Sequence, residues 1–457
     1  MASDTIERTP LESWIALKLG VSGERLRREH VERYQLELLR RTVEWAHRHG
    51  RFYRRLRVGA KHAESLQGSR PRERDLLDLA SLADLRLLPF TTALDLRERG
   101  PELLCVSQDD VRRVVTLYSS GTTGTPKRLY FTADDQELTV DFFRVGMSTL
   151  TAPGDRVSIL LPGAVPGSVG DLLALALRRS GVTPIPHGFV RDLPAAVDLL
   201  RRERPTALVG VPVQVLALAR YAEEVAGESF RLKSVLLASD HVPDSIVREL
   251  TRAWSCQVFE HYGMTEMGLG GGVDCEAHAG YHLREADLYV EIVDPLTGEP
   301  LPEGVRGEVV FTTLTRQGMP LVRYRTGDLS RFLPGPCPCG TVLRRLERVR
   351  GRLAGQTVDV TMPELDEALF AVPGVVDFAV VASRDPSSLA ITMWSLRPAR
   401  HGVEGAVHEA LDQVPAICAA RRAGTLSVTV STACVGERLP RGPEKRTIAE
   451  GQATVRK

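Results

Sequence analysis

The chain has 457 residues, 43% of them hydrophobic and 5% aromatic, and its 59 basic and 58 acidic side chains leave a net charge of +1. The length allows about three domains, and the balance of charge argues against a nucleic-acid or membrane partner. No run of about 18 apolar residues occurs, and the N-terminal MASDTIERTPLESW lacks the apolar core of a signal peptide. We therefore expect a soluble, cytoplasmic protein with a small-molecule partner.

The first 100 or so residues have the spacing of helices. The apolar residues on one expected face are Val31, Tyr34, Leu38 and Trp45, and Gly50 ends the segment. Arginine and glutamate alternate elsewhere in this region, which favours a solvated helix face over a nucleic-acid-binding arm.

From about residue 155 the pattern changes to short β-rich runs, each followed by a turn and a helical stretch. The runs are RVSILLPG, ALVGVP, SVLLASD and QVFEHYG. This alternation predicts a mainly parallel, helix-flanked sheet. Ligands bind such sheets at the carboxyl ends of the strands, where Ser239, Asp240 and residues 263–266 are expected.

The next segment, 287–314, reads DLYVEIVDPLTGEPLPEGVRGEVVFTTL and predicts an antiparallel extension, because two alternating strands flank a Pro/Gly turn. The last 100 or so residues have their own helix and strand patterns, which predict a small α+β domain. The fold class is therefore α/β. We expect an N-terminal domain over residues 1–351, with a helical lead-in over about 1–100, and a C-terminal domain over 352–457.

Residues 118–131 read YSSGTTGTPKRLYF, a loop rich in glycine and hydroxyl side chains with a lysine behind it. Glycine amides, hydroxyl donors and a lysine charge together can cradle phosphate oxygens. The Walker pattern fails, because Pro126 precedes Lys127 and Arg128 follows it. A polar surface loop is the alternative for this stretch taken alone.

Four motifs occur in order along the chain: SSGTTGTPK at 119–127, HYGMTE at 261–266, YRTGD at 324–328 and LPRGPEK at 439–445. Together they resemble those of the adenylate-forming acyl-CoA ligases, which have a large N-terminal domain and a small mobile C-terminal lid. The segments LPFTTALDLRERGP, GMTEMG, TTLTRQGMPLVRYRTGD and PCPCG are similar to those of the phenylacetate-CoA ligase branch. The resemblance covers the chain from about residue 30 to its end.

This resemblance implies an AMP-forming acid–thiol ligase that uses ATP, Mg²⁺ and CoA. The enzyme would join a small carboxylic acid, in this branch an aryl or arylacetic acid, to AMP and then transfer the acyl group to CoA. The catalytic residues implied are Lys445, Lys127 and Glu266. The implied ATP and AMP contacts are Ser119, Ser120, Gly121, Thr122, Thr123, Gly124, Ser239, Asp240, His261, Tyr262, Gly263, Met264, Thr265, Asp328 and Arg352, and the implied substrate contacts are Val211 and Pro212.

By the resemblance, Glu266 holds Mg²⁺, which prefers carboxylate and phosphate oxygens. Tyr262 would stack on adenine, and Asp328 would accept hydrogen bonds from the ribose hydroxyls, with Arg352 nearby. Taken without the motifs, Glu266 is an ordinary surface acid, Tyr262 a buried core ring and Asp328 a turn residue.

Lys445 has the place of the mobile lysine that bridges the attacking carboxylate and the α-phosphate. The chain departs from relatives in two places: Glu444 stands where a glycine usually precedes this lysine, and the hinge reads GRLAGQ without the acidic residues that usually follow GR. An impaired hinge would slow the second half-reaction or pass it to another acceptor.

Three cysteines and one histidine, Cys275, His282, Cys337 and Cys339, supply the ligand types of a structural Zn²⁺ site. Members of the similar branch that share the GYH histidine and the C-x-C pair bind zinc. His278 is a competing ligand, and free buried cysteines are the alternative without metal.

Two other functions remain open from the sequence. An adenylating enzyme could pass the acyl group to an amine, a hydroxyl or a carrier protein, or the chain could be a non-catalytic nucleotide-binding or zinc-stabilised interaction protein. Retention of Lys127, Glu266, Asp328 and Lys445 argues against a mere binder. The family likeness also implies a homodimer.

Overall fold

The computed structural model describes residues 6–21, 25–55, 79–117, 126–349, 351–353, 360–384, 387–397, 403–440 and 446–451. The chain divides into two compact units. Unit 1 combines Met1–Thr149 with His261–Leu353, and unit 2 combines Leu150–Glu260 with Ala354–Lys457.

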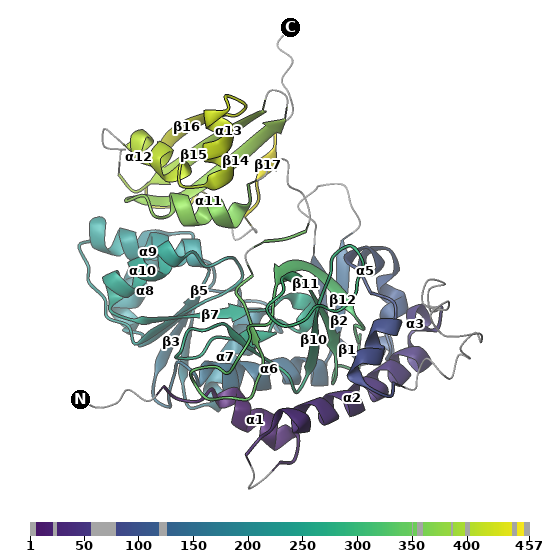
Figure 1. Cartoon of the computed structure of the whole chain (residues 1–457). Coiled ribbons are helices and arrows are strands. Elements are labelled where there is room, and N and C mark those ends of the chain that lie inside the picture. The colour runs from purple at the N-terminus through teal and green to yellow at the C-terminus, as the bar shows by residue number, and fades with distance from the viewer. Residues whose placement is uncertain are drawn as a thin grey trace. The chain divides into compact units, whose positions relative to one another are not determined.

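Unit 1 begins with helices, as the spacing of the first 100 residues predicts (Figure 1). They are α1 (Pro10–Lys18), α2 (Arg28–His49), α3 (Arg51–Arg55) and α5 (Ala93–Arg99), with α6 (Ala133–Met147) later and short 3-10 turns η1 (Leu82–Leu87), η2 (Gly100–Leu103) and η3 (Gln108–Asp110) between. The buried face of α2 includes Val31, Leu39, Val43 and Ala46. The expected face was therefore partly wrong: Tyr34, Leu38 and Trp45 are only partly buried beside it.

Unit 1 also contains antiparallel strands. The pair β1 (Val111–Leu117) and β2 (Lys127–Thr132) flanks the glycine-rich loop, and the sheet of β10 (Leu288–Val293), β11 (Gly307–Thr313) and β12 (Tyr324–Ser330) is the predicted antiparallel extension. The short strands β8 (Gly272–Val273), β9 (Tyr281–Leu283) and β13 (Arg345–Leu346) form a further antiparallel set.

Unit 2 contains a parallel sheet of order β4-β3-β5-β6-β7. Its strands are β3 (Arg156–Ile159), β4 (Thr183–Pro186), β5 (Ala207–Gly210), β6 (Ser234–Leu237) and β7 (Gln257–Tyr262), whose last two residues belong to unit 1. The helices between them are α7 (Val169–Arg179), α8 (Leu193–Glu203), α9 (Pro212–Glu224) and α10 (Asp244–Trp254). The central strands β5 and β6 are buried along their whole length, which is typical of a parallel sheet covered on both faces and confirms the predicted α/β class.

The C-terminal part of unit 2 is a small α+β arrangement around a sheet of order β16-β15-β14-β17. Its elements are α11 (Met362–Leu369), β14 (Val375–Arg384), β15 (Ser387–Ser395), α12 (Val403–Leu411), α13 (Pro415–Arg422), β16 (Ser427–Cys434) and β17 (Ala449–Glu450). The sequence predicts helices over 363–372 and 404–414 and strands over 375–383, 389–396 and 426–432, which correspond to α11, α12, β14, β15 and β16; α13 and β17 were not predicted. The domain boundary at residue 352 and the mobility of this part stay predictions.

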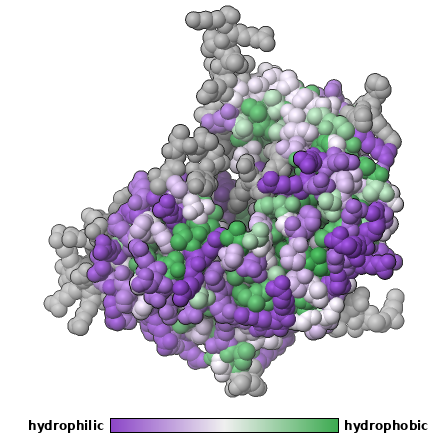
Figure 2. Space-filling model, turned by 180° about the vertical axis from the view of Figure 1, so that it is seen from behind, coloured by the Kyte–Doolittle hydropathy of each residue, from purple (hydrophilic) through white to green (hydrophobic). Residues whose placement is uncertain are grey.

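Among the helices of the described residues, none combines the length and the apolar character needed to cross a membrane. The face of the molecule in Figure 2 mixes hydrophilic and hydrophobic residues. The exposed large hydrophobic side chains, such as Leu17, Val165 and Leu296, come from separate parts of the chain.

Candidate active site

A partly buried ion pair joins two of the predicted residues. Lys127 is the first residue of β2, and Glu266 lies in the short 3-10 turn η4 (Thr265–Met267) that follows β7. Lys127 Nζ donates to Glu266 Oε1 over 2.5 Å, and Tyr324 Oη donates to the same oxygen over 3.2 Å. The structure thus places a cation beside a carboxylate that is only 4% exposed.

The charge of Glu266 depends on this cation. Burial by itself raises the pKa of a carboxyl group, because the charged form loses its hydration. The Lys127 ammonium outweighs that effect, with help from the Tyr324 hydroxyl, and the pKa of Glu266 is lowered from its ordinary value. Glu266 is therefore an anion that could exchange its lysine partner for another cation.

The turn that carries Glu266 is tightly packed behind Gly263. A Cβ at this position would lie 2.5 Å from the Leu269 carbonyl oxygen and 2.8 Å from His261 Cε1. Only glycine fits there without displacing backbone. Met264 is extended and Thr265 begins η4, so residues 263–265 serve to turn the chain from β7 toward Glu266.

A second constellation forms around Asp328 in β12, which is 6% exposed. Tyr262 Oη donates to Asp328 Oδ2 over 3.0 Å, and Arg352 Nε donates to Oδ1 over 2.5 Å. Each carboxylate oxygen can accept a further hydrogen bond. The Tyr262 ring is buried and stacked on Tyr281, with 5.9 Å between ring centroids. Tyr262 is thus a buried ring of the core that also donates a hydrogen bond to Asp328. Its stacking on adenine stays a prediction.

Four predicted contacts lie in unit 2, at the carboxyl ends of β5 and β6. Val211 and Pro212 follow β5 and begin α9, and Ser239 and Asp240 follow β6. Ser239 has a φ of 80°, an unfavourable conformation for a residue with a Cβ, and such strain clusters at functional sites. Asp240 Oδ1 accepts a hydrogen bond from the His241 amide over 2.9 Å.

Other predicted residues lie outside the described part of the chain. They are Ser119, Ser120, Gly121, Thr122, Thr123 and Gly124 in the loop, and Lys445 near the C-terminus.

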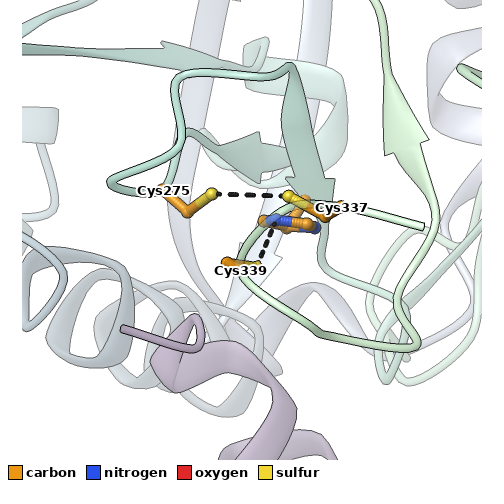
Figure 3. Close-up of side chains that lie close together, drawn as sticks. Cys275, Cys337 and Cys339 are labelled. Carbon is orange, nitrogen blue, oxygen red and sulfur yellow. Dashed lines mark hydrogen bonds between the residues drawn. The ribbon is translucent and has the colours of Figure 1, made fainter. Parts of the chain in front are cut away.

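The predicted zinc ligands come together in unit 1 (Figure 3). Cys275 follows β8, His282 lies in β9, and Cys337 and Cys339 lie in the loop between β12 and β13. The four ligand atoms all lie within 4.8 Å of one another, and all four residues are buried. The competing His278 instead lies with Nδ1 2.7 Å from Asp274 Oδ2.

The spacing of these atoms suits a tetrahedral ion. A tetrahedron with Zn–S bonds of about 2.3 Å has S···S edges of about 3.8 Å. Cys275 Sγ and Cys337 Sγ are 3.8 Å apart, and Cys339 Sγ lies 3.5 Å from His282 Nε2. Burial lowers the pKa of His282, yet hydrogen bonds with Cys337 and Cys339 raise it to about 9.

Sequence reasoning gave Tyr324 no role, although it belongs to the motif YRTGD. Alternate residues of a strand share one face, so a spacing of four puts Tyr324 on the face of Asp328. That spacing, together with the hydroxyl of tyrosine, was the signal that could have marked it.

The sequence itself has relatives among known enzymes. Residues 57–315 match the family described as AMP-binding enzyme. The phenylacetate-coenzyme A ligase of Thermus thermophilus is 32% identical over 378 residues, which are 79% of this chain and 80% of the relative. That of Escherichia coli is 31% identical, over 64% of this chain and 68% of the relative.

Solved structures show the same fold. A structure of 2-hydroxyisobutyryl-CoA ligase in the postadenylation state matches 93% of this chain and 91% of its own, with a TM-score of 0.73 and 22% identity. A benzoate CoA ligase from Burkholderia xenovorans LB400 matches 75% of this chain and 68% of its own, with a TM-score of 0.53 and 17% identity.

The protein belongs to the AMP-binding enzyme family, because the family match covers more than half of the chain and the relative from Thermus thermophilus covers 79% of it. Within that family it stands in the phenylacetate-CoA ligase-like branch, as the motifs suggest.

Proposed function

We propose that this protein is an ATP-dependent carboxylate–CoA ligase that acts on an aryl or arylacetic acid. The substrate carboxylate attacks the α-phosphate of ATP, which forms an acyl-adenylate and releases pyrophosphate. The CoA thiol then attacks the acyl carbon, and AMP leaves. The named ligases of the branch support the reaction, and the pair Lys127–Glu266 is the observation in this chain that carries it.

Attack of one anion on another requires positive charge and fixed reactants. Lys127 would turn from Glu266 toward the phosphate oxygens when ATP binds, since it directly follows the glycine-rich loop in the sequence. Asp328 would hold the ribose hydroxyls with lone pairs that Tyr262 and Arg352 leave free. Lys445 stays a prediction as the bridge between the two reactants.

The donor set at Glu266 fits Mg²⁺. The ion prefers carboxylate oxygen and usually binds through one or two carboxylates together with substrate phosphates. Glu266 is charged and buried, and it pairs with Lys127, which follows the glycine-rich loop in the sequence. Bound there, Mg²⁺ would neutralise phosphate charge.

The cluster of Cys275, His282, Cys337 and Cys339 fits a structural Zn²⁺, with four ligands and no open position. None of these four residues belongs to the groups around Glu266 and Asp328. We therefore assign the cluster a role in stability and not in the reaction. The homodimer implied by the family likeness stays a prediction.

Pyrophosphate release from ATP and Mg²⁺ tests the reaction. We would use a panel of aryl, arylacetic and short aliphatic acids, with and without CoA, and identify the products by mass spectrometry. Release with an acyl-CoA product supports the ligase. Release of an adenylate that never becomes a thioester would point to another acceptor and to the unusual GRLAGQ hinge.

A pair of variants locates the activity. Glu266→Gln removes the charge that would hold Mg²⁺ and should slow pyrophosphate release by about a hundredfold. Glu291→Gln is the matched control, because Glu291 is also buried but pairs with Arg323 in the antiparallel sheet. Equal rates in the two variants would exclude Glu266 from the site.

A further inference from the structure

The pair Lys127–Glu266 raises the question of what fixes its geometry. The two residues are 139 positions apart in the chain. A lysine side chain is flexible and carries about 2 kcal/mol of rotamer entropy, so the ion pair alone cannot set the separation of the two backbones. Something must join β2 to the turn η4.

Arg316, in the connection between β11 and β12, makes that link. Its Nη1 donates to the main-chain oxygen of Glu266 over 2.8 Å, and its Nη2 donates to that of Tyr130 over 3.3 Å. Tyr130 lies in β2, three residues after Lys127. One guanidinium therefore bonds both the residue that would hold Mg²⁺ and the strand that begins with the lysine.

The guanidinium is itself held in place. Its central carbon lies 4.3 Å from the centre of the Phe131 ring, also in β2. The next two amides in the chain, those of Gln317 and Gly318, donate to Asp135 over 3.1 and 3.2 Å. Asp135 also accepts a hydrogen bond from the Thr132 amide over 3.0 Å, at the start of α6. The connection that carries Arg316 is thus anchored to the other end of β2.

This arrangement is a costly way to gain stability alone. Arg316 is 6% exposed, and among the residues that the structure describes no carboxylate lies within ion-pair distance of its guanidinium, while Asp135 and Glu266 stabilise its charge from farther away. A buried charge without a bonded carboxylate is unfavourable, and an apolar side chain of similar volume often stabilises a protein more. A planar guanidinium, however, can bridge two fixed carbonyl groups, which an apolar or a lysine side chain cannot do as rigidly.

We propose that Arg316 is a positioning residue that sets the distance between Lys127 and Glu266, and through it the affinity of the site for Mg²⁺ with ATP. This inference rests on the proposed function. It assigns Arg316 no contact with substrate.

The test is the Mg²⁺ dependence of ATP binding to the full-length protein, measured by calorimetry over a range of Mg²⁺ concentrations. Arg316→Lys keeps the charge but loses the planar bridge. We expect the Mg²⁺ concentration for half-maximal ATP binding to rise about tenfold, as for other residues that orient metal ligands. Glu266→Gln, measured alongside, reports on the Mg²⁺ site directly.

Arg323→Lys is the matched control. Arg323 is also buried, bonds the Arg86 and Leu88 carbonyl oxygens over 2.9 Å each, and lies over the Phe90 ring, but its side chain pairs with Glu291 and not with Glu266 or β2. Both lysine variants should melt at a lower temperature than the wild type, and only Arg316→Lys should change the Mg²⁺ requirement.

The outcomes separate the two proposals. An unchanged Mg²⁺ requirement in Arg316→Lys, with Glu266→Gln strongly affected, would overturn the role of Arg316 and leave the proposed function intact. An equal rise of the Mg²⁺ concentration for half-maximal ATP binding in Arg316→Lys and Arg323→Lys would mean that Arg316 has a structural role only. Wild-type ATP binding that does not depend on Mg²⁺ would overturn the role of Arg316 together with the Mg²⁺ site at Glu266, while pyrophosphate release would still test the ligase reaction.

Discussion

Replacing Lys127 with methionine isolates the electrostatics of the ion pair. At 2.5 Å and an effective dielectric constant of about 20, the attraction between the two charges is about 7 kcal/mol before any cost of burial is subtracted. Breaking a buried pair costs about 3–5 kcal/mol net, because the remaining charge is left without a partner. The Tyr324 hydroxyl still bonds Glu266, so we expect a loss near the lower end, about 3 kcal/mol, at pH 8.

The loss should depend on pH. In the wild type the pKa of Glu266 is lowered, so its contribution to stability is present above about pH 4.5 and is lost only at lower pH. Without the ammonium, burial raises the pKa of Glu266, and the folded protein then keeps a proton that the unfolded chain releases. The variant's stability should therefore fall as pH rises above about 4.5, and the difference in melting temperature from wild type should widen from pH 5 to pH 8.

Lys233→Met is the matched control for this experiment. Lys233 also pairs with a carboxylate, Asp155, over 3.1 Å, but its side chain is 51% exposed. An exposed pair contributes about 1 kcal/mol or less. If the two methionine variants lost the same small amount of stability, with no change of pH dependence in Lys127→Met, the reasoning about a buried charge at Glu266 would be refuted.

Further predictions concern separate parts of unit 1. Metal analysis of protein purified without a histidine tag should find about one zinc per chain, and Cys337→Ser should lose the zinc and lower the melting temperature; a metal-free, equally stable wild type would exclude the site. Burial lowers the pKa of His261 to about 4, so stability should be lost as pH falls from about 6.5 to 4, by at most about 3 kcal/mol, and His261→Phe should flatten that part of a melting-temperature profile. Gly263→Ala should slow pyrophosphate release by moving the turn before Glu266, whereas Gly351→Ala, whose Cβ would meet nothing within 4 Å, should not; equal rates would contradict the crowding argument.

The sequence predicted the parts of the fold that depend on local patterns. Apolar runs such as 207–210 and 234–237, separated by helical stretches, were enough for the parallel sheet, and the alternation in 288–313 was enough for the antiparallel one. The eight-residue α13 was missed because a helix of that length leaves little periodicity to detect. Separate motifs likewise predicted Lys127 and Glu266 as site residues, each from its own stretch of sequence.

What the sequence could not predict is which side chains meet over long separations. Apart from the family resemblance, nothing in the local sequence distinguishes His278 from His282 as a neighbour of the C-x-C pair. The pairing of β9 with β13, with His282 opposite Arg345, brings His282 to the loop of Cys337 and Cys339. The bond of Arg316 to Glu266 depends in the same way on tertiary packing, and the role of Tyr262 depends on where Asp328 lies.

The cluster of Cys275, His282, Cys337 and Cys339 closes a loop of the chain that contains part of the candidate active site. Cys275 and Cys337 are 62 residues apart, and the segment between them carries Arg316, Tyr324 and Asp328. A tie across a loop of this length restricts the unfolded chain by about 4 kcal/mol in the loop-entropy description of cross-links. With the proposed zinc bound, the segment that contains β9 to β12 would fold as a closed loop with fewer unfolded conformations than an open chain. Loss of the metal could then disable the ligase during its folding, although every residue that contacts a substrate is still present.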